Sequence, residues 1–333
     1  MGLHLFLKKS KIYGLENIPK NKPVLFLPNH QNALVDALLI GTNCTRKPYF
    51  LTRSDVFVNP ILKRLFYSFK MIPVYRMRDG RDSLKNNEAV FNTCANLLCT
   101  NEAVLMFPEA NHSLVRRVRP LSKGFTRVLF AALEKKPKLD IYIVPVGVNY
   151  KEAIHFPDKA AIYYGKPIQL KDWYNKEDLP SSISKIKNTV SVRLKLLTIH
   201  IDEEEDYEHI ISKLETEKIN FLNPDEANQR VGALLQEKSL DVEKKYKKNS
   251  LNLLRGLFNL LNLPVIILWK KLIKPKVPEA EFIGTFRFVF GLLIYPLYYG
   301  LLLFFIGFFG DWYSALALVG IIFMYNYIYV KLG

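Results

Sequence analysis

Short apolar runs separated by polar, glycine or proline residues fill the first 200 residues of the chain. Apolar runs of about four to eight residues between such turns predict buried strands, and longer stretches with helical spacing predict helices. The two alternate here, which is typical of an α/β domain. The expected strands cover residues 24–28, 48–52, 71–75, 103–107, 141–149 and 160–164.

The pattern changes twice after residue 200. Residues 201–250 are rich in charge, with apolar positions at helical spacing, which predicts a solvated helical connector. From residue 251 the chain is largely apolar, but residues 251–274 contain Arg255, Pro264 and a lysine-rich end. This segment is expected to form an interfacial or re-entrant helix.

Two charge-free stretches close the sequence. Residues 288–309 give 22 positions and residues 313–330 give 18, each long enough for a hydrocarbon core of about 30 Å. The three residues between them suffice for a hairpin turn only. We therefore expect a C-terminal helical membrane hairpin, the alternative being a buried helical hairpin in a soluble protein. Arg287 and Lys331 flank it and place both ends on the cytoplasmic side.

Composition narrows the possible partners. Lys and Arg number 47 against 31 Asp and Glu, a net charge of +16 that favours anionic partners. No zinc finger or RNA-binding aromatic signature is present, so nucleic acid ranks low as a partner. Three cysteines give no disulfide framework and indicate a reducing compartment. The six histidines lack metal-ligand spacing, and no glycine-rich nucleotide loop occurs.

The strongest candidate chemistry lies at the end of the first expected strand. Asn29 and His30 follow the apolar run, and Asp36 comes six residues after His30, on the first turns of the next expected helix. A carboxylate on one ring nitrogen fixes the tautomer and stabilises the imidazolium once the other nitrogen has taken a proton. The pair therefore predicts a general base for a hydroxyl proton. A capping Asn beside an ordinary surface His would give the same pattern.

Further charged residues follow later strands. Arg76 comes after the strand at 71–75 and can bind a phosphate in bidentate fashion; an ordinary charged loop is the alternative. Glu109 follows the strand at 103–107 and could accept hydrogen bonds from a polyol hydroxyl, or be a simple turn carboxylate. The basic segment 116–123 includes Arg116 and ends in Lys123 at the start of an apolar helix, where backbone N–H groups attract anions. A solvated basic face is the alternative for this segment.

These residues fall in four blocks whose order resembles that of the glycerolipid acyltransferases, the superfamily of lysophosphatidate and glycerol-3-phosphate acyltransferases. The blocks are Asn29-His30 to Asp36, Met71-Ile-Pro-Val-Tyr-Arg76, Phe107-Pro-Glu-Ala-Asn-His-Ser113 and Ile143-Val-Pro-Val-Gly147. Even the lead-in, residues 14–19, is similar to the family's first-strand approach. The resemblance covers roughly residues 10–200.

The chain departs from the common family pattern in three places. Five residues separate His30 from Asp36 where most members have four, which is similar to the Asn-His-x-Asn-x-x-x-Asp pattern of a eukaryotic-type glycerol-3-phosphate acyltransferase subgroup. Lys70 stands at a usual Gly. In the third block Ala110 replaces Gly and Asn111-His112 replaces Thr-Arg, so a substrate-binding Arg is absent at its usual place.

The resemblance implies a mixed β-sheet flanked by helices, with an acyltransferase domain over residues 1–200. The charge and apolar patterns add the connector 201–250 and a membrane module over residues 251–333. Together they predict an integral membrane enzyme whose catalytic domain lies on the cytoplasmic face. The enzyme would transfer a fatty acyl group from acyl-CoA or acyl-carrier protein to glycerol 3-phosphate or lysophosphatidate, without a metal or other cofactor. His30 and Asp36 would be catalytic. The implied substrate-binding residues are Asn32, Arg76, Glu109, Arg116 and Lys123.

Two other functions stay open at this stage. The altered third block allows an acyltransferase that acts on another lyso-lipid, such as a lyso-amino-acid lipid. A non-catalytic membrane protein that binds lipid on the same fold is the second alternative.

Overall fold

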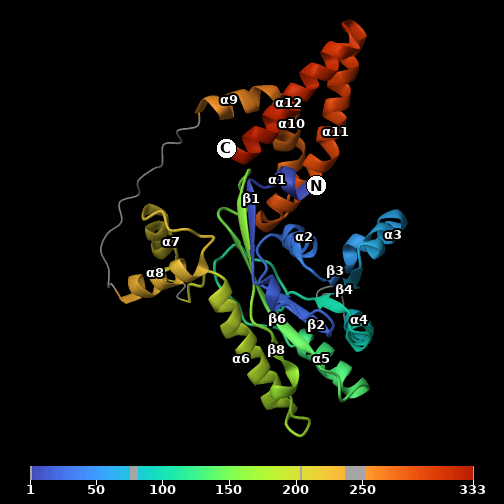
Figure 1. Cartoon of the computed structure of the whole chain (residues 1–333), viewed down its shortest axis with the longest axis vertical. Helices are drawn as coiled ribbons and strands as arrows, with labels where there is room; N and C mark the ends of the chain where they lie inside the picture. The colour runs from blue at the N-terminus through green and yellow to red at the C-terminus, as the bar shows by residue number, and fades with distance from the viewer. Residues whose placement is uncertain (1, 76–81, 203–204, 237–251, 333) are drawn as a thin grey trace.

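A mixed β-sheet forms the centre of the protein (Figure 1). The computed structural model describes residues 2–75, 82–202, 205–236 and 252–332. Within them the sheet has the strand order β1-β7-β6-β2-β5-β3-β4, with β8 also paired to β6. The pairs β6–β7 and β6–β8 are antiparallel, and the other pairs are parallel. The strands are β1 (Lys9–Tyr13), β2 (Val24–Pro28), β3 (Tyr49–Arg53), β4 (Met71–Val74), β5 (Ala103–Leu105), β6 (Tyr142–Tyr150), β7 (Lys159–Tyr164) and β8 (Ile168–Gln169).

The six strands predicted from sequence are present, with bounds shifted by no more than two residues. β1 and β8 were not predicted. β1 reads Lys-Ser-Lys-Ile-Tyr and lies at the sheet edge with most of its residues exposed, so no apolar run marks it. β8 has only two residues. The sheet therefore confirms the predicted fold class.

Helices cover both faces of the sheet. The central strand β2 is buried throughout, and its side chains alternate between two cores. Leu25 and Leu27 join the core under α4 (Asp82–Cys99), α5 (Gly124–Lys135) and α6 (Leu179–Leu197). Val24 and Phe26 join the opposite core, which includes α2 (Ala33–Asn43). Two shorter helices are α1 (Gly2–Phe6), whose Leu3 and Phe6 pack against the second core, and α3 (Pro60–Ser68).

Residues 201–250 were expected to form a solvated connector, but their described part has a buried core. Helices α7 (Tyr207–Thr216) and α8 (Pro224–Gln236) form a small core of their own. Ile199 and Ile201, which follow α6, are buried in this core and join it to the α/β domain. The segment therefore belongs, in its described part, to the packed body of the protein.

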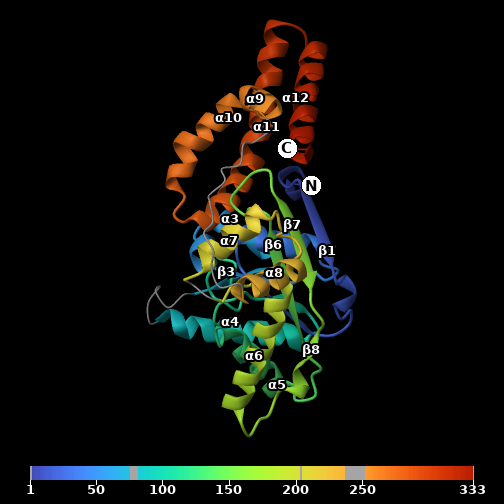
Figure 2. The same cartoon turned by 90° about the vertical axis from the view of Figure 1, so that its left-hand side faces the viewer.

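The C-terminal helices extend away from the sheet (Figure 2). Helices α11 (Ile283–Phe309) and α12 (Trp312–Leu332) are long and apolar enough to cross a membrane, with mean hydropathy of 2.1 and 1.7. Before them, α9 (Asn252–Leu261) and α10 (Leu263–Leu268) meet at an 83° bend, as in a broken span or a re-entrant loop. At this bend Asn262 and Asn326 of α12 exchange two hydrogen bonds of 2.8 and 2.9 Å.

The base of the hairpin is joined directly to the α/β domain. Helix α11 begins five residues before the charge-free stretch that predicted it, so Arg287 lies inside the helix. The Thr285 hydroxyl accepts the backbone N–H of Leu34 at 3.0 Å, and Arg287 donates to the carbonyl of Ile154 at 2.9 Å. Gly284 packs against Asn32 so closely that a Cβ there would come within 2.4 Å of its Oδ1. These contacts hold the start of α11 against the start of α2.

Candidate active site

The turn between β2 and α2 fixes the position of His30. The side chain of Asn29 continues the sheet pairing with β6, because its amide donates to the carbonyl of Val148 at 3.0 Å and its Oδ1 accepts the Val148 N–H at 2.7 Å. The backbone N–H of Ser113 donates to the His30 carbonyl at 2.9 Å from the opposite side. The turn is therefore held by both neighbouring segments.

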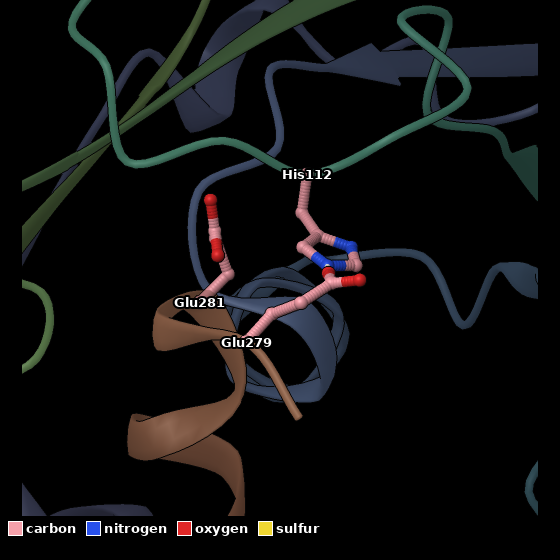
Figure 3. Close-up of side chains that lie close together, drawn as sticks. All are labelled: His112, Glu279 and Glu281. Atoms are coloured by element: carbon pink, nitrogen blue, oxygen red, sulfur yellow. The ribbon is translucent and has the colours of Figure 1, made fainter. Parts of the chain in front are cut away.

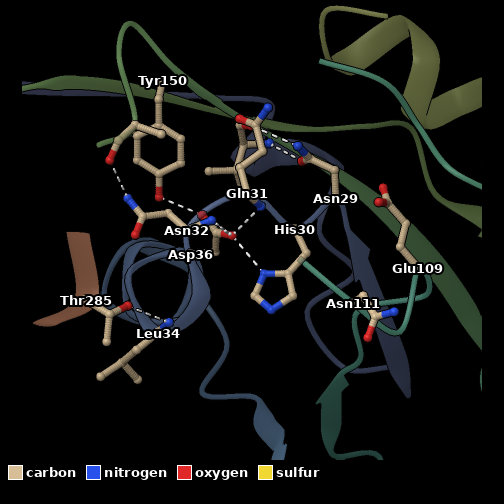
Figure 4. Close-up of polar contacts among 12 residues, drawn as sticks. Asn29, His30, Gln31, Asn32, Leu34, Asp36, Glu109, Asn111, Tyr150 and Thr285 are labelled. Atoms are coloured by element: carbon tan, nitrogen blue, oxygen red, sulfur yellow. Dashed lines mark hydrogen bonds and ion pairs between the residues drawn. The ribbon is translucent and has the colours of Figure 1, made fainter. Parts of the chain in front are cut away.

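Asp36 lies fully buried beneath the turn (Figure 4). Its Oδ2 lies 2.8 Å from His30 Nδ1 and accepts the backbone N–H groups of Gln31 and Asn32, each at 2.8 Å. Its Oδ1 accepts the hydroxyl of Tyr150 at 2.6 Å. The predicted His–Asp pair therefore exists, and Tyr150, at the end of β6, completes it.

The contact with Asp36 selects one tautomer of His30. An ionised carboxylate can only accept a hydrogen bond, so the Nδ1 of His30 carries the hydrogen and Nε2 is left as the basic atom. Nε2 points away from Asp36 (Figure 4). Burial lowers the pKa of His30 from its ordinary value, and Asp36 opposes this shift. The ring is thus neutral at pH 7 and ready to take a proton at Nε2.

Aromatic rings enclose the imidazole. Phe107 stacks on His30 with ring centroids 3.7 Å apart, and His112 meets it edge-on at 5.6 Å. His112 in turn packs against Phe282, 4.5 Å away, just before α11. The surroundings of the base are therefore built from the third sequence block and from the start of the membrane helix.

Glu109 and Arg119 form an ion pair beside the base. Glu109 is buried and its Oε2 lies 2.7 Å from Nε of Arg119, which also donates to the carbonyl of Asn111. Burial raises the pKa of Glu109 to about 7, and Arg119 opposes the shift. The Oε1 atom of Glu109 is buried without a hydrogen-bond partner among the described residues. Because such an atom is costly to leave unpaired, it marks a place for a hydroxyl donor.

A small polar pocket joins these groups. His30, Glu109 and Ser113 line it together with Thr198 and Ile199, which follow α6. The predicted base and the predicted acceptor residue therefore face one pocket. Thr198 and Ile199 lie outside the four sequence blocks, so their part in the pocket was not predicted.

Three other predicted residues lie in different settings. Arg116 donates to the carbonyls of Tyr150 and Lys151 at 3.1 and 2.9 Å, and its guanidinium lies 4.2 Å from the ring of Phe221. These contacts join β6 to the α7–α8 core, so the guanidinium of Arg116 has a structural role in place of the predicted contact with substrate. Lys123 is exposed immediately before α5. Arg76 lies outside the described residues.

Asn32, also predicted to bind substrate, faces the membrane helix instead of the pocket. Its amide donates to the carbonyl of Ala153 at 2.9 Å, and its Oδ1 is buried against Gly284. In this structure Asn32 therefore contributes to the contact between α2 and α11.

One group of side chains has donor atoms suited to a cation. His112 Nε2 lies 2.9 Å from Glu279 Oε2, and Glu281 is close to both, so that all three ligand atoms fall within 4.8 Å of one another (Figure 3). Imidazole and carboxylate are ordinary zinc ligands. Glu279 is about half exposed, and its pairing with His112 explains the same geometry without a metal.

Comparisons with known proteins find matches in the part of the chain that holds the site. A family model described as Acyltransferase matches residues 9–149. The chain is 24% identical over 131 residues to glycerol-3-phosphate O-acyltransferase 1 of Saccharomyces cerevisiae, and 29% identical over 140 residues to a 1-acyl-sn-glycerol-3-phosphate acyltransferase of Chlamydomonas reinhardtii. These matches cover 38% and 41% of this chain, and 17% and 38% of the two relatives.

Among solved structures, the 1-acyl-sn-glycerophosphate acyltransferase of Thermotoga maritima aligns with a TM-score of 0.40 and 16% identity, over 56% of this chain and 72% of that one. Residues 9–149 thus match an acyltransferase family, and the two relatives support a likeness of this part of the chain to the glycerolipid acyltransferase superfamily.

Proposed function

We propose that the protein is a membrane-bound O-acyltransferase of phospholipid synthesis. It would transfer a fatty acyl group from acyl-CoA or acyl-carrier protein to a hydroxyl of glycerol 3-phosphate or lysophosphatidate. The observation that carries this proposal is the hydrogen-bonded series Tyr150–Asp36–His30, with His30 and Glu109 lining one pocket.

The reaction follows from this geometry. Nε2 of His30 removes the proton of the acceptor hydroxyl as its oxygen attacks the thioester carbonyl. A carbon–oxygen bond forms, the carbon–sulfur bond breaks, and the imidazolium returns the proton to the leaving thiolate. Asp36 stabilises the imidazolium in between, since its charge lies 2.8 Å from Nδ1. Each step uses residues of this chain alone.

Glu109 and Arg119 are suited to the acceptor. The unpaired Oε1 of Glu109 can accept a hydroxyl hydrogen bond, which orients the polyol. The guanidinium of Arg119 has five N–H donors, and its contacts with Glu109 and Asn111 do not exhaust them. We therefore assign phosphate binding to Arg119, together with Arg76. Arg119 comes seven residues after His112, which replaces the family's usual Arg.

The decisive experiment is an acceptor and donor screen. Membranes containing the full chain would be given labelled acyl-CoA or acyl-carrier protein with glycerol 3-phosphate, lysophosphatidate or a lyso-amino-acid lipid. Labelled phosphorylated product that disappears with His30→Ala supports the proposal. Product only from a lyso-lipid without phosphate would favour the alternative acceptor, which the replacement by Asn111 and His112 allows. Acyl transfer to none of them would favour a lipid-binding role.

We also propose that α11 and α12 anchor the protein with the catalytic domain on the cytoplasmic face. Their length and apolarity support this, as do the basic residues of the 270–276 segment. Resistance to carbonate extraction would test the anchoring, and protease protection in sealed vesicles would test the orientation. Release by carbonate without detergent would contradict it.

A further inference from the structure

An apolar groove of about 430 Å³ lies between α11 and the helix that combines α10 with the π-helical turn Trp269–Ile273. Most of its large side chains are exposed on the protein surface. The walls carry Leu268, Leu272, Ile273, Phe286, Val289 and Leu293. Exposed apolar side chains are ordinary on a helix that faces lipid, but a concave apolar surface of this volume is also suited to bind an apolar ligand.

The groove is held open by fixed contacts. Trp269 is buried and its ring centroid lies 5.6 Å from that of Phe290 on α11. The guanidinium of Arg287 lies 5.2 Å from the Trp269 ring and is hydrogen-bonded to the carbonyl of Ile154 in the α/β domain. Both walls are therefore fixed to each other and to the body that carries the site, so the groove is preformed.

Two series of contacts connect one end of the groove to the candidate active site. Thr285 lines the groove, and its hydroxyl accepts a backbone N–H in the first turn of α2. A second connection runs through aromatic rings: Phe286 of the groove contacts Phe282, which contacts His112, which contacts His30. The groove then continues along α11, away from the sheet, to Ile294.

We propose that this groove holds the acyl chain of the acyl donor, with the thioester at its Thr285 end. The inference rests on the proposed function and adds the location of the chain. The groove is about three times the roughly 150 Å³ of a cavity that accommodates benzene, so a long acyl chain fits. Four exposed lysines, at positions 270, 271, 274 and 276, lie on the same segment. Their charge complements the phosphates of acyl-CoA or the acidic surface of a carrier protein.

The donor is favoured over the acceptor as the occupant. Every donor of this reaction has an acyl chain, whereas of the two proposed acceptors lysophosphatidate has one and glycerol 3-phosphate has none. The polar groups assigned to the acceptor, Glu109 and Arg119, line or adjoin a separate pocket on the third sequence block. A chain in the groove would bring its thioester toward His30 from the side of α11.

Tryptophan substitutions at two depths test the proposal. Leu293→Trp should fill the far part of the groove, and Val289→Trp should fill its middle. Each methylene group that can no longer be buried costs about a fourfold loss in kcat/KM. We expect Leu293→Trp to lower the ratio of kcat/KM for a hexadecanoyl donor to that for a decanoyl donor by at least about tenfold, and Val289→Trp to lower it further. The matched control is Leu297→Trp, an exposed position on α11 beyond the groove.

Unchanged chain-length ratios in both variants, with wild-type turnover, would overturn the groove assignment and leave the proposed function intact. A change of equal size in the control would also overturn it. No acyl transfer by the wild-type protein would instead contradict the proposed function.

A binding measurement separates these outcomes. Full-length protein in phosphatidylcholine vesicles would be photo-crosslinked with a diazirine-bearing hexadecanoyl-CoA, and the adducts mapped by mass spectrometry. Adducts on residues 268–273 or 285–294 that unlabelled hexadecanoyl-CoA displaces would support the assignment, even in a protein without turnover. Adducts elsewhere would refute it. Adducts that hexadecanoyl-CoA does not displace would identify the groove as a site for bilayer lipid only.

Discussion

The two sides of the candidate active site differ in how their polar atoms are paired. On the side of the base, Asp36 has four hydrogen bonds from His30, Tyr150 and two backbone N–H groups, and is fully buried. On the acceptor side, Glu109 is nearly as buried but has one oxygen without a partner among the described residues. The His30 side is therefore fully paired in the free protein, whereas on the proposed function the Glu109 side would gain a hydrogen bond from the acceptor.

This difference assigns separate tasks to the two sides. Preorganised groups lower the barrier of the chemical step because they need no rearrangement as charge develops. Groups that become paired only with the ligand contribute to binding and to the choice of ligand. Substitutions at the base should therefore change kcat, and substitutions at Glu109 or Arg119 should change the KM for the acceptor.

His30→Ala is expected to have the largest effect. Loss of a general base lowers kcat by about 10²- to 10⁴-fold. The fold should persist, because Asp36 keeps its bonds to Tyr150 and to the backbone. The rate would be measured in membranes with saturating donor and acceptor, and thermal unfolding would be compared in detergent.

His155→Ala is the matched control for this experiment. His155 also pairs with a carboxylate, that of Glu152 at 3.1 Å, but is two-thirds exposed. Its removal should leave turnover unchanged. A His30→Ala protein that retains more than half of the wild-type rate would show that the imidazole is not the base.

Arg119→Ala is expected to raise the KM for a phosphate-bearing acceptor by roughly 10- to 150-fold, since a lost charge-assisted hydrogen bond costs about 1.5–3 kcal/mol. The KM for the acyl donor should stay within about twofold of wild type, because the donor does not use this group. Arg193→Ala, an exposed position on α6, is the control for a loss of positive charge. An equal rise in both KM values would mean that Arg119 supports the fold of the site and does not bind the phosphate.

The base side could be predicted from sequence because it is local. His30 and Asp36 are six residues apart, and a strand end followed by a helix brings them together. Tyr150 could not be predicted, since it is 114 residues from Asp36 and meets it only because β6 pairs with β2. Sequence proximity was misleading for the basic segment: the guanidinium of Arg116 is directed at carbonyls of β6, while Arg119, three residues on, meets Glu109.

The contribution of the membrane module to the site was also beyond sequence reasoning. The apolar stretches identified α11 and α12 because hydrocarbon length and lack of charge are local properties. Thr285 meets Leu34 across 251 residues, and Glu279 meets His112 across 167 residues. Such contacts depend on how the helices dock against the α/β domain, and the pattern of apolar and polar residues along the sequence does not predict them.

Tyr150→Phe tests whether Tyr150 contributes to catalysis by positioning Asp36. The variant keeps the ring but removes the donor at 2.6 Å from Asp36, and a roughly tenfold fall in kcat is expected. With one donor fewer, the carboxylate attracts the proton of His30 more strongly. The pKa of His30 should therefore rise, and the ascending limb of the pH–kcat profile should move to higher pH. Tyr163→Phe, whose hydroxyl bonds the Leu222 carbonyl, should change neither quantity. A lower kcat without a shifted profile would indicate a purely structural role.

The smallest expected effect is a pH dependence that belongs to Glu109 alone. Burial raises the pKa of this carboxyl to about 7, so it is mostly protonated at pH 6 and mostly ionised at pH 8. The ionised form can accept a hydrogen bond from the hydroxyl of the acceptor substrate and can pair with Arg119. The kcat/KM for the acceptor should therefore rise with pH through this range, by at most about tenfold. The pKa of His30 is lowered from its ordinary 6.5, so its own ascending limb lies at lower pH. Glu109→Gln removes the titrating group and should leave only the lower limb, with a reduced plateau. A limb near pH 7 that survives in Glu109→Gln would belong to another group, and ionisation of Glu109 would then not control the use of the acceptor.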